Sequence, residues 1–259
     1  QLFGYVFLLD LGFLLASYFR RWRDLALVCF IGTYLTFMAW HAVHYTSVQL
    51  PVAFGFLTSF AAIFLLAQII PSLTRGKPST VRDLSLQVAN AVLYFGYAYL
   101  LLKPNFGSSI GFFFVLGAAV YLALAYRMSS REEEDRYHRY GLATIGLALV
   151  TLAIPLELDR NLVTVAWAVE ALALTWVGFR LRSYELRAFG STIFLIAGAR
   201  LLFLDSSLRG APYQLILNDR FIAFSLAIAC ALLARYLYRS RTAELKPEEQ
   251  RVPQVLGVA

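Results

Sequence analysis

Apolar residues occur along this chain in long, nearly continuous runs rather than in the short alternating patterns of soluble helices and strands. Nine such runs lie near residues 2–19, 25–43, 52–70, 85–102, 110–126, 140–156, 162–179, 188–204 and 220–238. A helix needs about 20 largely apolar residues to cross the hydrocarbon core of a bilayer, because each residue advances it by ~1.5 Å. The pattern therefore predicts an all-α integral membrane protein, a polytopic bundle of about nine transmembrane helices.

Prolines stand close to several ends of these runs. Pro51 and Pro71 bracket the third run, Pro104 follows the fourth, and Pro155 lies at the end of the sixth. Proline lacks the amide hydrogen that a helix interior uses and is best tolerated at helix ends. We therefore expect the helices to break near these positions.

Composition agrees with a membrane protein. Hydrophobic residues make up 59% of the 259 residues and charged residues only 15%, whereas a soluble domain carries about a quarter charged residues. The nine helices and their short links fill the chain and leave no room for a soluble globular domain. Cys29 and Cys230 both lie inside apolar runs, where we expect small core residues rather than a disulfide.

Basic residues alternate from loop to loop and predict the orientation. Of the 23 Lys and Arg residues, 18 lie after the first, third, fifth and seventh runs or at the end of the chain, from the end of the ninth run onward. The opposite loops hold only Lys103, Arg160, Arg209 and Arg220. Because basic loops stay in the cytoplasm, we predict that the N-terminus is outside and the C-terminus is cytoplasmic. Residues 1–240 then form the membrane bundle and residues 241–259 a cytoplasmic tail, disordered or bound to a partner.

A net charge of +7 can indicate nucleic-acid binding, but here the basic residues are spread through loops that flank the membrane. We therefore expect membrane lipids, and not nucleic acid, as partners. The chain begins with Gln1, outside by this topology and with no visible signal peptide. We expect this sequence to be the C-terminal part of a longer membrane protein, with further upstream helices or partner membrane subunits.

Among the ionisable residues inside the apolar runs, three are the most informative: Asp10 in the first, Glu170 in the seventh and Arg200 in the eighth. A charged side chain at the bilayer centre costs ~2.5–3.5 kcal/mol on insertion scales, so such residues normally face the bundle interior and pair or serve a polar pathway. These residues are the predicted intramembrane polar site. The short link between the seventh and eighth runs makes those helices antiparallel neighbours, so we expect Glu170 and Arg200 to face each other.

The spacing of these charges suggests an internal repeat. Asp10 precedes the pair Phe19-Arg20 by the same interval at which Glu170 precedes Phe179-Arg180. Repeated hairpins often build transporter sites at their interface. The alternative is purely structural: a buried ion pair would fix the register of two helices, and a neighbouring hydroxyl would satisfy Asp10.

Two other patterns have weaker chemical interpretations. His41 and His44 are spaced to hold a metal, or to place one imidazole over a haem or another porphyrin, but an aromatic belt at the membrane interface explains them better. The segment from Gly107 to Gly111 fits the G-x-S-x-G pattern of hydrolases, yet it lacks the strand-to-helix turn that this chemistry needs. We expect close helix packing at these glycines instead. No catalytic residue, bound metal or cofactor is therefore predicted.

Short motifs in the second half of the chain carry a family resemblance. They are TLAIPL at 151–156, AWAVE at 166–170, WVG at 176–178, RAFG at 187–190 and NDRF at 218–221. The C-terminal region resembles a bacterial family of multi-pass membrane proteins known as domain of unknown function 2339, with Trp167, Glu170, Asn218 and Arg220 as its motif residues. Where members often have glycine after the glutamate, this chain has Ala171, which leaves a close backbone approach there open. The resemblance implies a long bacterial inner-membrane protein and supplies no reaction.

Three classes of function remain open from the sequence. A transporter-like protein, or one that handles a cell-envelope substrate, would place Asp10, Glu170 and Arg200 around a polar cavity. A structural or accessory subunit of a membrane complex would use the same residues for packing. A membrane-embedded transferase would need a reactive group facing a pocket, and the sequence offers none. We therefore expect a protein that is not an enzyme.

Overall fold

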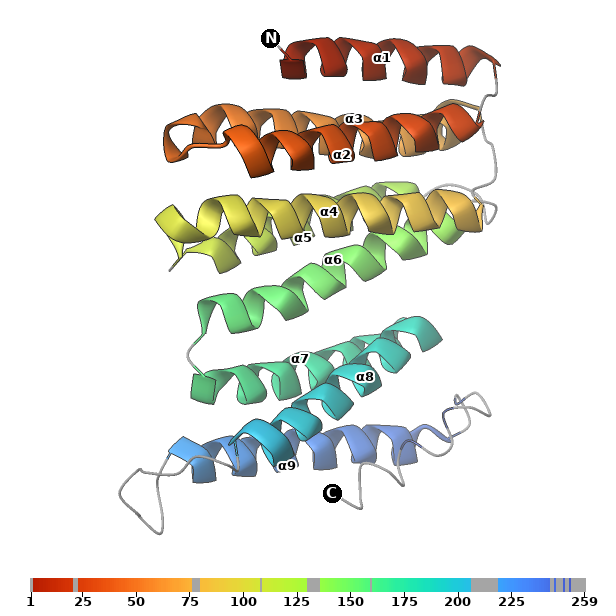
Figure 1. Ribbon diagram of the computed structural model, residues 1–259. Coiled ribbons are helices and arrows are strands. Elements are labelled where there is room, and N and C mark those ends of the chain that lie inside the picture. Colours follow the sequence, from red (N-terminus) through yellow and green to blue (C-terminus); the bar gives the residue numbers. More distant parts are fainter. Residues whose placement is uncertain are drawn as a thin grey trace. The chain divides into compact units, whose positions relative to one another are not determined.

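The computed structural model describes residues 2–20, 23–75, 80–107, 109–129, 136–158, 160–205, 219–242, 245, 249 and 252. Nearly all of these residues are helical, and no strand occurs among them. The chain forms two compact units, residues 1–153 and residues 154–259, whose helices are labelled in Figure 1. The predicted all-helical fold class is therefore confirmed for the described part of the chain.

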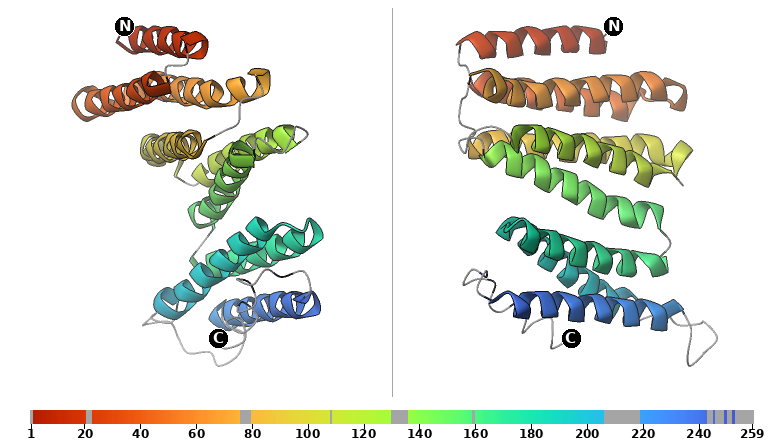
Figure 2. Two further views of the ribbon diagram at one scale, coloured as in Figure 1. Left: turned by 90° about the vertical axis from the view of Figure 1, so that its right-hand side faces the viewer. Right: turned by 180° about the vertical axis from the view of Figure 1, so that it is seen from behind.

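The first unit is a bundle of long helices joined by short links (Figures 1 and 2). Its elements are α1 (Leu2–Arg20), α2 (Arg23–His44), the short 3-10 helix η1 (Ser47–Gln49), α3 (Leu50–Arg75), α4 (Val81–Phe106), α5 (Ile110–Ser129) and most of α6 (Arg136–Glu157). Helix α1 packs against α2 and α3, and α4 packs against α3 and α5. Helices that follow one another in sequence are thus neighbours in space.

Aromatic side chains fill the interior of this first bundle. Phe3 of α1 contacts Phe37 and Trp40 of α2, with ring centroids 5.5 and 4.7 Å apart, and Phe30 contacts Phe64 of α3 at 5.3 Å. Such ring pairs contribute about 0.5–1.5 kcal/mol beyond the area that they bury. The predominantly apolar runs therefore have an inner face, built from large rings, as well as a face for lipid.

The second unit consists of α7 (Arg160–Arg180), α8 (Tyr184–Arg200), a π-helical turn labelled η3 (Leu201–Asp205) and α9 (Asp219–Ser240). Helices α8 and α9 both pack against α7. The contact of α7 with α8 is close because Gly190 has no side chain: a Cβ there would lie 2.9 Å from the carbonyl oxygen of Ala171. The backbones of α7 and α8 therefore do approach closely beside Ala171. The glycine that permits this approach is Gly190 of α8.

Helix ends follow polar capping residues more than hydropathy. Thr80 caps α4 by accepting a hydrogen bond from the Asp83 N–H at 3.4 Å, and Asp83 in turn accepts from the Thr80 N–H at 2.9 Å. This reciprocal arrangement satisfies amide hydrogens that the helix leaves open, so α4 begins four residues before its apolar run. The expected break at Pro71 is wrong, because α3 continues to Arg75.

Seven helical segments are long and apolar enough to cross a membrane. They are Leu25–His44, Ser47–Ile70, Val81–Phe106, Ile110–Met128, Arg139–Glu157, Leu162–Arg180 and Tyr184–Phe203. Helix α1 contributes a shorter apolar segment, Leu2–Leu15. Large apolar side chains such as Phe112 and Phe203 are exposed by 71 and 76%, as lipid-facing residues would be. The protein is therefore an α-helical membrane protein, while nine crossings stay a prediction.

The glycines of the G-x-S-x-G pattern do not lie together on one helix. Gly107 is the residue after α4, and α5 begins at Ile110, so the pattern spans the link between two helices. Close packing at Gly107 and Gly111 stays a prediction. Close packing is present at two other glycines: a Cβ on Gly117 would meet the ring of Phe95, and one on Gly141 would meet Leu84.

Candidate functional site

Asp10 is buried between α1 and α2. Its side chain is only 3% exposed, and Thr33 Oγ1 donates a hydrogen bond to Asp10 Oδ2 at 2.6 Å. Thr33 is equally buried. The sequence predicted an interior position for Asp10, and the neighbouring hydroxyl anticipated by the structural alternative is that of Thr33.

The residue after Thr33 begins a second polar contact. Tyr34 donates its hydroxyl hydrogen to Asn90 Oδ1 of α4 at 2.8 Å, and Asn90 Nδ2 donates to the carbonyl oxygen of Ala61 in α3 at 3.0 Å. Asn90 is 1% exposed. Its amide therefore ties three helices together in a low-dielectric interior, where such bonds are strong.

Gln87 lies one helical turn before Asn90 and is completely buried. It faces α6, since a Cβ on Gly141 would come within 2.9 Å of its Oε1. Among the residues that the structure describes, neither amide atom of Gln87 has a hydrogen-bond partner. We call Asp10, Thr33, Tyr34, Gln87 and Asn90 the polar seam of the first unit.

The second unit holds the other two predicted site residues. Arg200 Nε donates a hydrogen bond to Thr164 Oγ1 at 3.1 Å, and its guanidinium lies 5.7 Å from the ring centre of Trp167. Thr164 is fully buried in α7. Arg200 is therefore opposite Thr164, and Glu170 lies six residues further along α7, or ~9 Å. The pairing of Glu170 with Arg200 stays a prediction.

The remaining motif and metal candidates are placed as follows. Trp167 contacts Arg200, whereas Asn218 and the side chain of Arg220 lie outside the described residues. The His41 ring stacks on Tyr45 at 4.6 Å and meets Tyr97 edge-on at 5.7 Å, as an aromatic belt would arrange it. In the described part of the chain, no three His, Cys, Asp or Glu residues come close enough to hold a metal ion.

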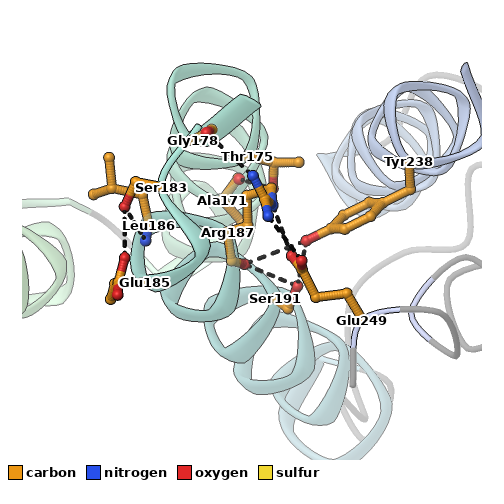
Figure 3. Close-up of polar contacts among 10 residues, drawn as sticks. All are labelled: Ala171, Thr175, Gly178, Ser183, Glu185, Leu186, Arg187, Ser191, Tyr238 and Glu249. Atoms are coloured by element: carbon orange, nitrogen blue, oxygen red, sulfur yellow. Dashed lines mark hydrogen bonds and ion pairs between the residues drawn. The ribbon is translucent and has the colours of Figure 1, made fainter. Parts of the chain in front are cut away.

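A further polar cluster lies where α7 turns into α8 (Figure 3). Ser183 caps α8 by accepting a hydrogen bond from the Leu186 N–H at 3.4 Å, which places Arg187 in the first turns of the helix. The missing side chain of Gly178 makes room for Arg187, because a Cβ there would be 2.6 Å from Arg187 Cγ. The guanidinium packs over Phe179 at 4.9 Å.

Arg187 is paired with a residue from the C-terminal tail. Its Nε donates to Glu249 Oε1 at 2.6 Å and its Nη2 donates to Glu249 Oε2 at 2.7 Å, as Figure 3 shows. The two side chains are 3 and 4% exposed. Tyr238 of α9 shares a hydrogen bond of 3.0 Å with Ser191 beside this pair.

Sequence reasoning missed this cluster. Arg187 was counted as a topological charge, and residues 241–259 were expected to be disordered or bound to a partner. In the structure, Glu249 of this segment pairs with Arg187. A signal was available in the motif RAFG, which pairs an arginine with a glycine at a helix start, but it did not identify the acidic partner.

A family model described as "Predicted membrane protein (DUF2339)" matches residues 1–259. The chain belongs to this family. Membership in DUF2339 covers both compact units, and not only the C-terminal region on which the resemblance was noticed. The chain matches no curated protein and no solved structure.

The DUF2339 assignment agrees with the helical fold and describes a membrane protein. It attaches no substrate or reaction to the polar seam or to the Arg187–Glu249 pair. The function of both sites must therefore be argued from their chemistry.

Proposed function

We propose that this DUF2339 protein handles a polar substrate or an ion within the bacterial inner membrane, in a transporter-like manner, through its polar seam. The observation that carries the proposal is the buried carboxyl group of Asp10, held by Thr33 inside a helix bundle. Intramembrane ionisable residues commonly mark substrate paths and proton relays. The proposal includes no catalytic step and no cofactor.

Asp10 supports a role in substrate handling over a purely structural role, because neutral groups already join the helices of the first unit. Tyr34, Asn90 and the Ala61 carbonyl connect α2, α4 and α3, and Thr58 and Tyr94 connect α3 and α4 through hydroxyls 3.1 Å apart. Uncharged contacts of this kind hold membrane helices together at lower cost than a carboxylate. A charged residue that packing does not require favours a role in binding.

Gln87 adds binding capacity to the seam. Its side chain offers two donor hydrogens and two acceptor lone pairs, it is 0% exposed, and it has no partner among the described residues. Buried amides are almost always hydrogen-bonded, so this one favours a polar guest. A proton would use the carboxyl group of Asp10, and the amide of Gln87 would hold a polar group of the substrate.

The proposed placement follows the alternation of basic residues: nine crossings, with the N-terminus outside and the C-terminus in the cytoplasm. Seven segments that meet the length and hydropathy requirement support most of these crossings. The apolar segment of α1 and the length of α9, Asp219–Ser240, are compatible with the other two. Membrane lipids and partner membrane subunits are the proposed partners.

The test is ion flux through proteoliposomes that contain the full chain, with a pH-sensitive dye to detect H⁺ and uptake of radioactive Na⁺ to detect Na⁺. A K⁺ gradient with valinomycin supplies the driving voltage, and separate runs add Na⁺. We expect the protein to carry H⁺ or Na⁺, and Asp10→Asn, which keeps the shape but removes the charge, to lower the flux at least about tenfold, because charged partners contribute ~1.5–3 kcal/mol. Glu157→Gln, at an exposed carboxyl group, is the matched control and should leave it unchanged.

Equal flux from the Asp10→Asn variant and the natural protein would rule out the carboxyl group as the working residue. The absence of any protein-dependent flux of either ion, from correctly folded protein, would favour the accessory-subunit alternative. Transferase chemistry would appear instead as a modified lipid in the same vesicles.

A further inference from the structure

The pairing of Arg187 with Glu249 has the geometry of a ligand in a binding site. The guanidinium offers Nε and Nη2 side by side, and the carboxylate fills both at 2.6 and 2.7 Å. This fork recognises carboxylates and phosphates equally well, because both present two oxygens at the right spacing. Glu249 lies 62 residues away in sequence and is brought in by the tail.

The receiving half of the site is built by the helices alone. Gly178 leaves space for the Arg187 stem and its carbonyl oxygen accepts a hydrogen bond from Nη1 at 3.4 Å, while Phe179 supports the guanidinium at 4.9 Å. None of these contacts involves the tail. A buried guanidinium needs a paired anion, so the place that Glu249 leaves on departure is open to another anion.

Two further features favour a phosphate from a lipid. The site lies where the candidate spans Leu162–Arg180 and Tyr184–Phe203 meet, and the ends of membrane-spanning helices lie near the lipid headgroups. A second guanidinium, that of Arg241, packs on the same Phe179 ring at 5.7 Å. Neighbouring basic residues at the membrane surface attract anionic lipid headgroups.

We propose that the Arg187 site binds the phosphate of an anionic lipid headgroup, and that Glu249 occupies this site as a competitor built into the chain. The tail and the lipid then exclude each other. Lipid binding releases the tail, and a docked tail keeps the lipid out. The proposal concerns the second unit and is independent of the polar seam.

The test measures lipid binding to the full chain in detergent, by native mass spectrometry. The probe is a short-chain phosphatidylglycerol; phosphatidylcholine of the same chain length and inorganic phosphate are the comparisons. We expect Glu249→Gln to lower the apparent Kd for phosphatidylglycerol at least about tenfold. The reason is that the docked tail blocks the site in a fraction of the molecules, and the apparent affinity rises when that blocked fraction is removed. Arg187→Gln in the Glu249→Gln background should abolish the gain, and Arg187→Lys, which keeps the charge but loses the fork, should retain only part of it.

Competition also predicts a change in the natural chain. Phosphatidylglycerol should accelerate tryptic cleavage after Arg251, two residues beyond Glu249 in sequence, whereas phosphatidylcholine should not. This measurement needs no variant and decides the matter if Glu249→Gln fails to fold. The proposal is overturned by unchanged lipid affinity in Glu249→Gln, by a gain that survives loss of Arg187, by an equal gain with inorganic phosphate, or by cleavage that does not respond to the lipid.

Discussion

At the scale of single residues, most members of the polar seam are buried together with a specific partner, and Gln87 is the exception among them. Asp10 accepts from Thr33, Asn90 joins Tyr34 to the Ala61 carbonyl, and each acceptor is reached at 3.0 Å or less. In a low-dielectric interior, losing one member of such a pair costs more than losing both. Single substitutions are therefore more informative than deletions of whole segments.

The first prediction concerns the hydroxyl beside Asp10. Thr33→Val keeps the shape of the side chain but removes the hydrogen bond to Asp10 Oδ2. We expect the free energy of unfolding in detergent micelles to fall by about 1–3 kcal/mol, the cost of an unsatisfied buried group. The control is Thr192→Val, an exposed threonine whose hydroxyl bonds only to its own helix at Ala188. An equal loss of unfolding free energy in both variants would mean that replacing threonine by valine causes the loss, and not the missing hydrogen bond to Asp10.

The second prediction tests the proposed pairing of Glu170 with Arg200. The backbone register leaves these residues ~9 Å apart along the helix axes, but side chains lean toward their own helix N-terminus, which shortens that offset in antiparallel helices. If the two pair, Glu170→Leu alone should cost roughly 3–5 kcal/mol, and adding Arg200→Met should recover most of it. Chemical unfolding of both single variants and the double variant measures this coupling. Additive losses of stability in the double variant would show that Glu170 and Arg200 do not interact.

The sequence allowed some of these residues to be identified and not others. Asp10 and Arg200 stand out as charges within apolar runs, so their interior contacts could be anticipated from insertion cost alone. Glu249 could not, because an acidic residue in a polar tail gives no sign of burial until the path of the tail is known. Thr33, Tyr34 and Asn90 were missed for a related reason: uncharged polar residues are common within membrane helices and carry little information singly.

At the scale of helices, hydropathy predicts the interior of each element and capping decides its ends. Each of the nine apolar runs falls on a described helix, with the eighth ending in the π-helical turn Leu201–Asp205. The ends differ by several residues, as at Val81, where Thr80 and Asp83 begin α4 ahead of its apolar run. Polar capping residues lower the average hydropathy, so an average over apolar runs leaves them outside the predicted helix.

The repeat hypothesis also belongs to this scale. Asp10 and Glu170 each lie ten residues before an arginine that ends a helix, Arg20 of α1 and Arg180 of α7. The equal spacing agrees with a duplication but does not test it. Superposing α1–α2 on α7–α8 is the test, and a displacement of more than one helical turn, ~5.4 Å, between Asp10 and Glu170 would exclude the repeat.

The third prediction concerns the contact between α7 and α8. Gly190→Ala places a Cβ 2.9 Å from the Ala171 carbonyl and 3.0 Å from Thr175 Oγ1, and the backbone of α7 must move to accept it. We expect a loss of about 1–3 kcal/mol, the usual cost of overpacking. Gly198→Ala in the same helix meets open space and should be neutral or stabilising by up to ~1 kcal/mol, as helix propensity predicts. Thermal unfolding of the two variants side by side measures the difference, and equal effects would exclude a tight contact at Gly190.

At the scale of the whole molecule, composition and charge determine more than any motif does. The high apolar content predicts a membrane protein, and the family match over residues 1–259 agrees. The division into two compact units at residue 153 could not be read from hydropathy, because runs on both sides of that point look alike. The units are held together internally by contacts such as Gly141 against Leu84 and Gly190 against Ala171. Hydropathy does not predict which residue a given glycine will contact.

The fourth prediction is the topology, and it follows from the strict alternation of basic loops. If the N-terminus is outside, the link between α2 and α3 faces the periplasm and the link between α5 and α6 faces the cytoplasm. Val48, 88% exposed, marks the first link, and Glu133 marks the second. Both natural cysteines are buried, so an impermeant maleimide should label only cysteines introduced at these positions.

In intact spheroplasts we expect labelling of Val48→Cys and none of Glu133→Cys, which should react only after the membrane is opened. The unmodified chain controls for background from Cys29 and Cys230. Because each crossing reverses the side, an error of one helix between the two positions would give both the same accessibility. Labelling of Glu133→Cys in intact spheroplasts would therefore contradict the predicted orientation or the helix count, and the response of Val48→Cys decides which: no labelling there means that the orientation is inverted, and labelling means that a crossing between them was miscounted.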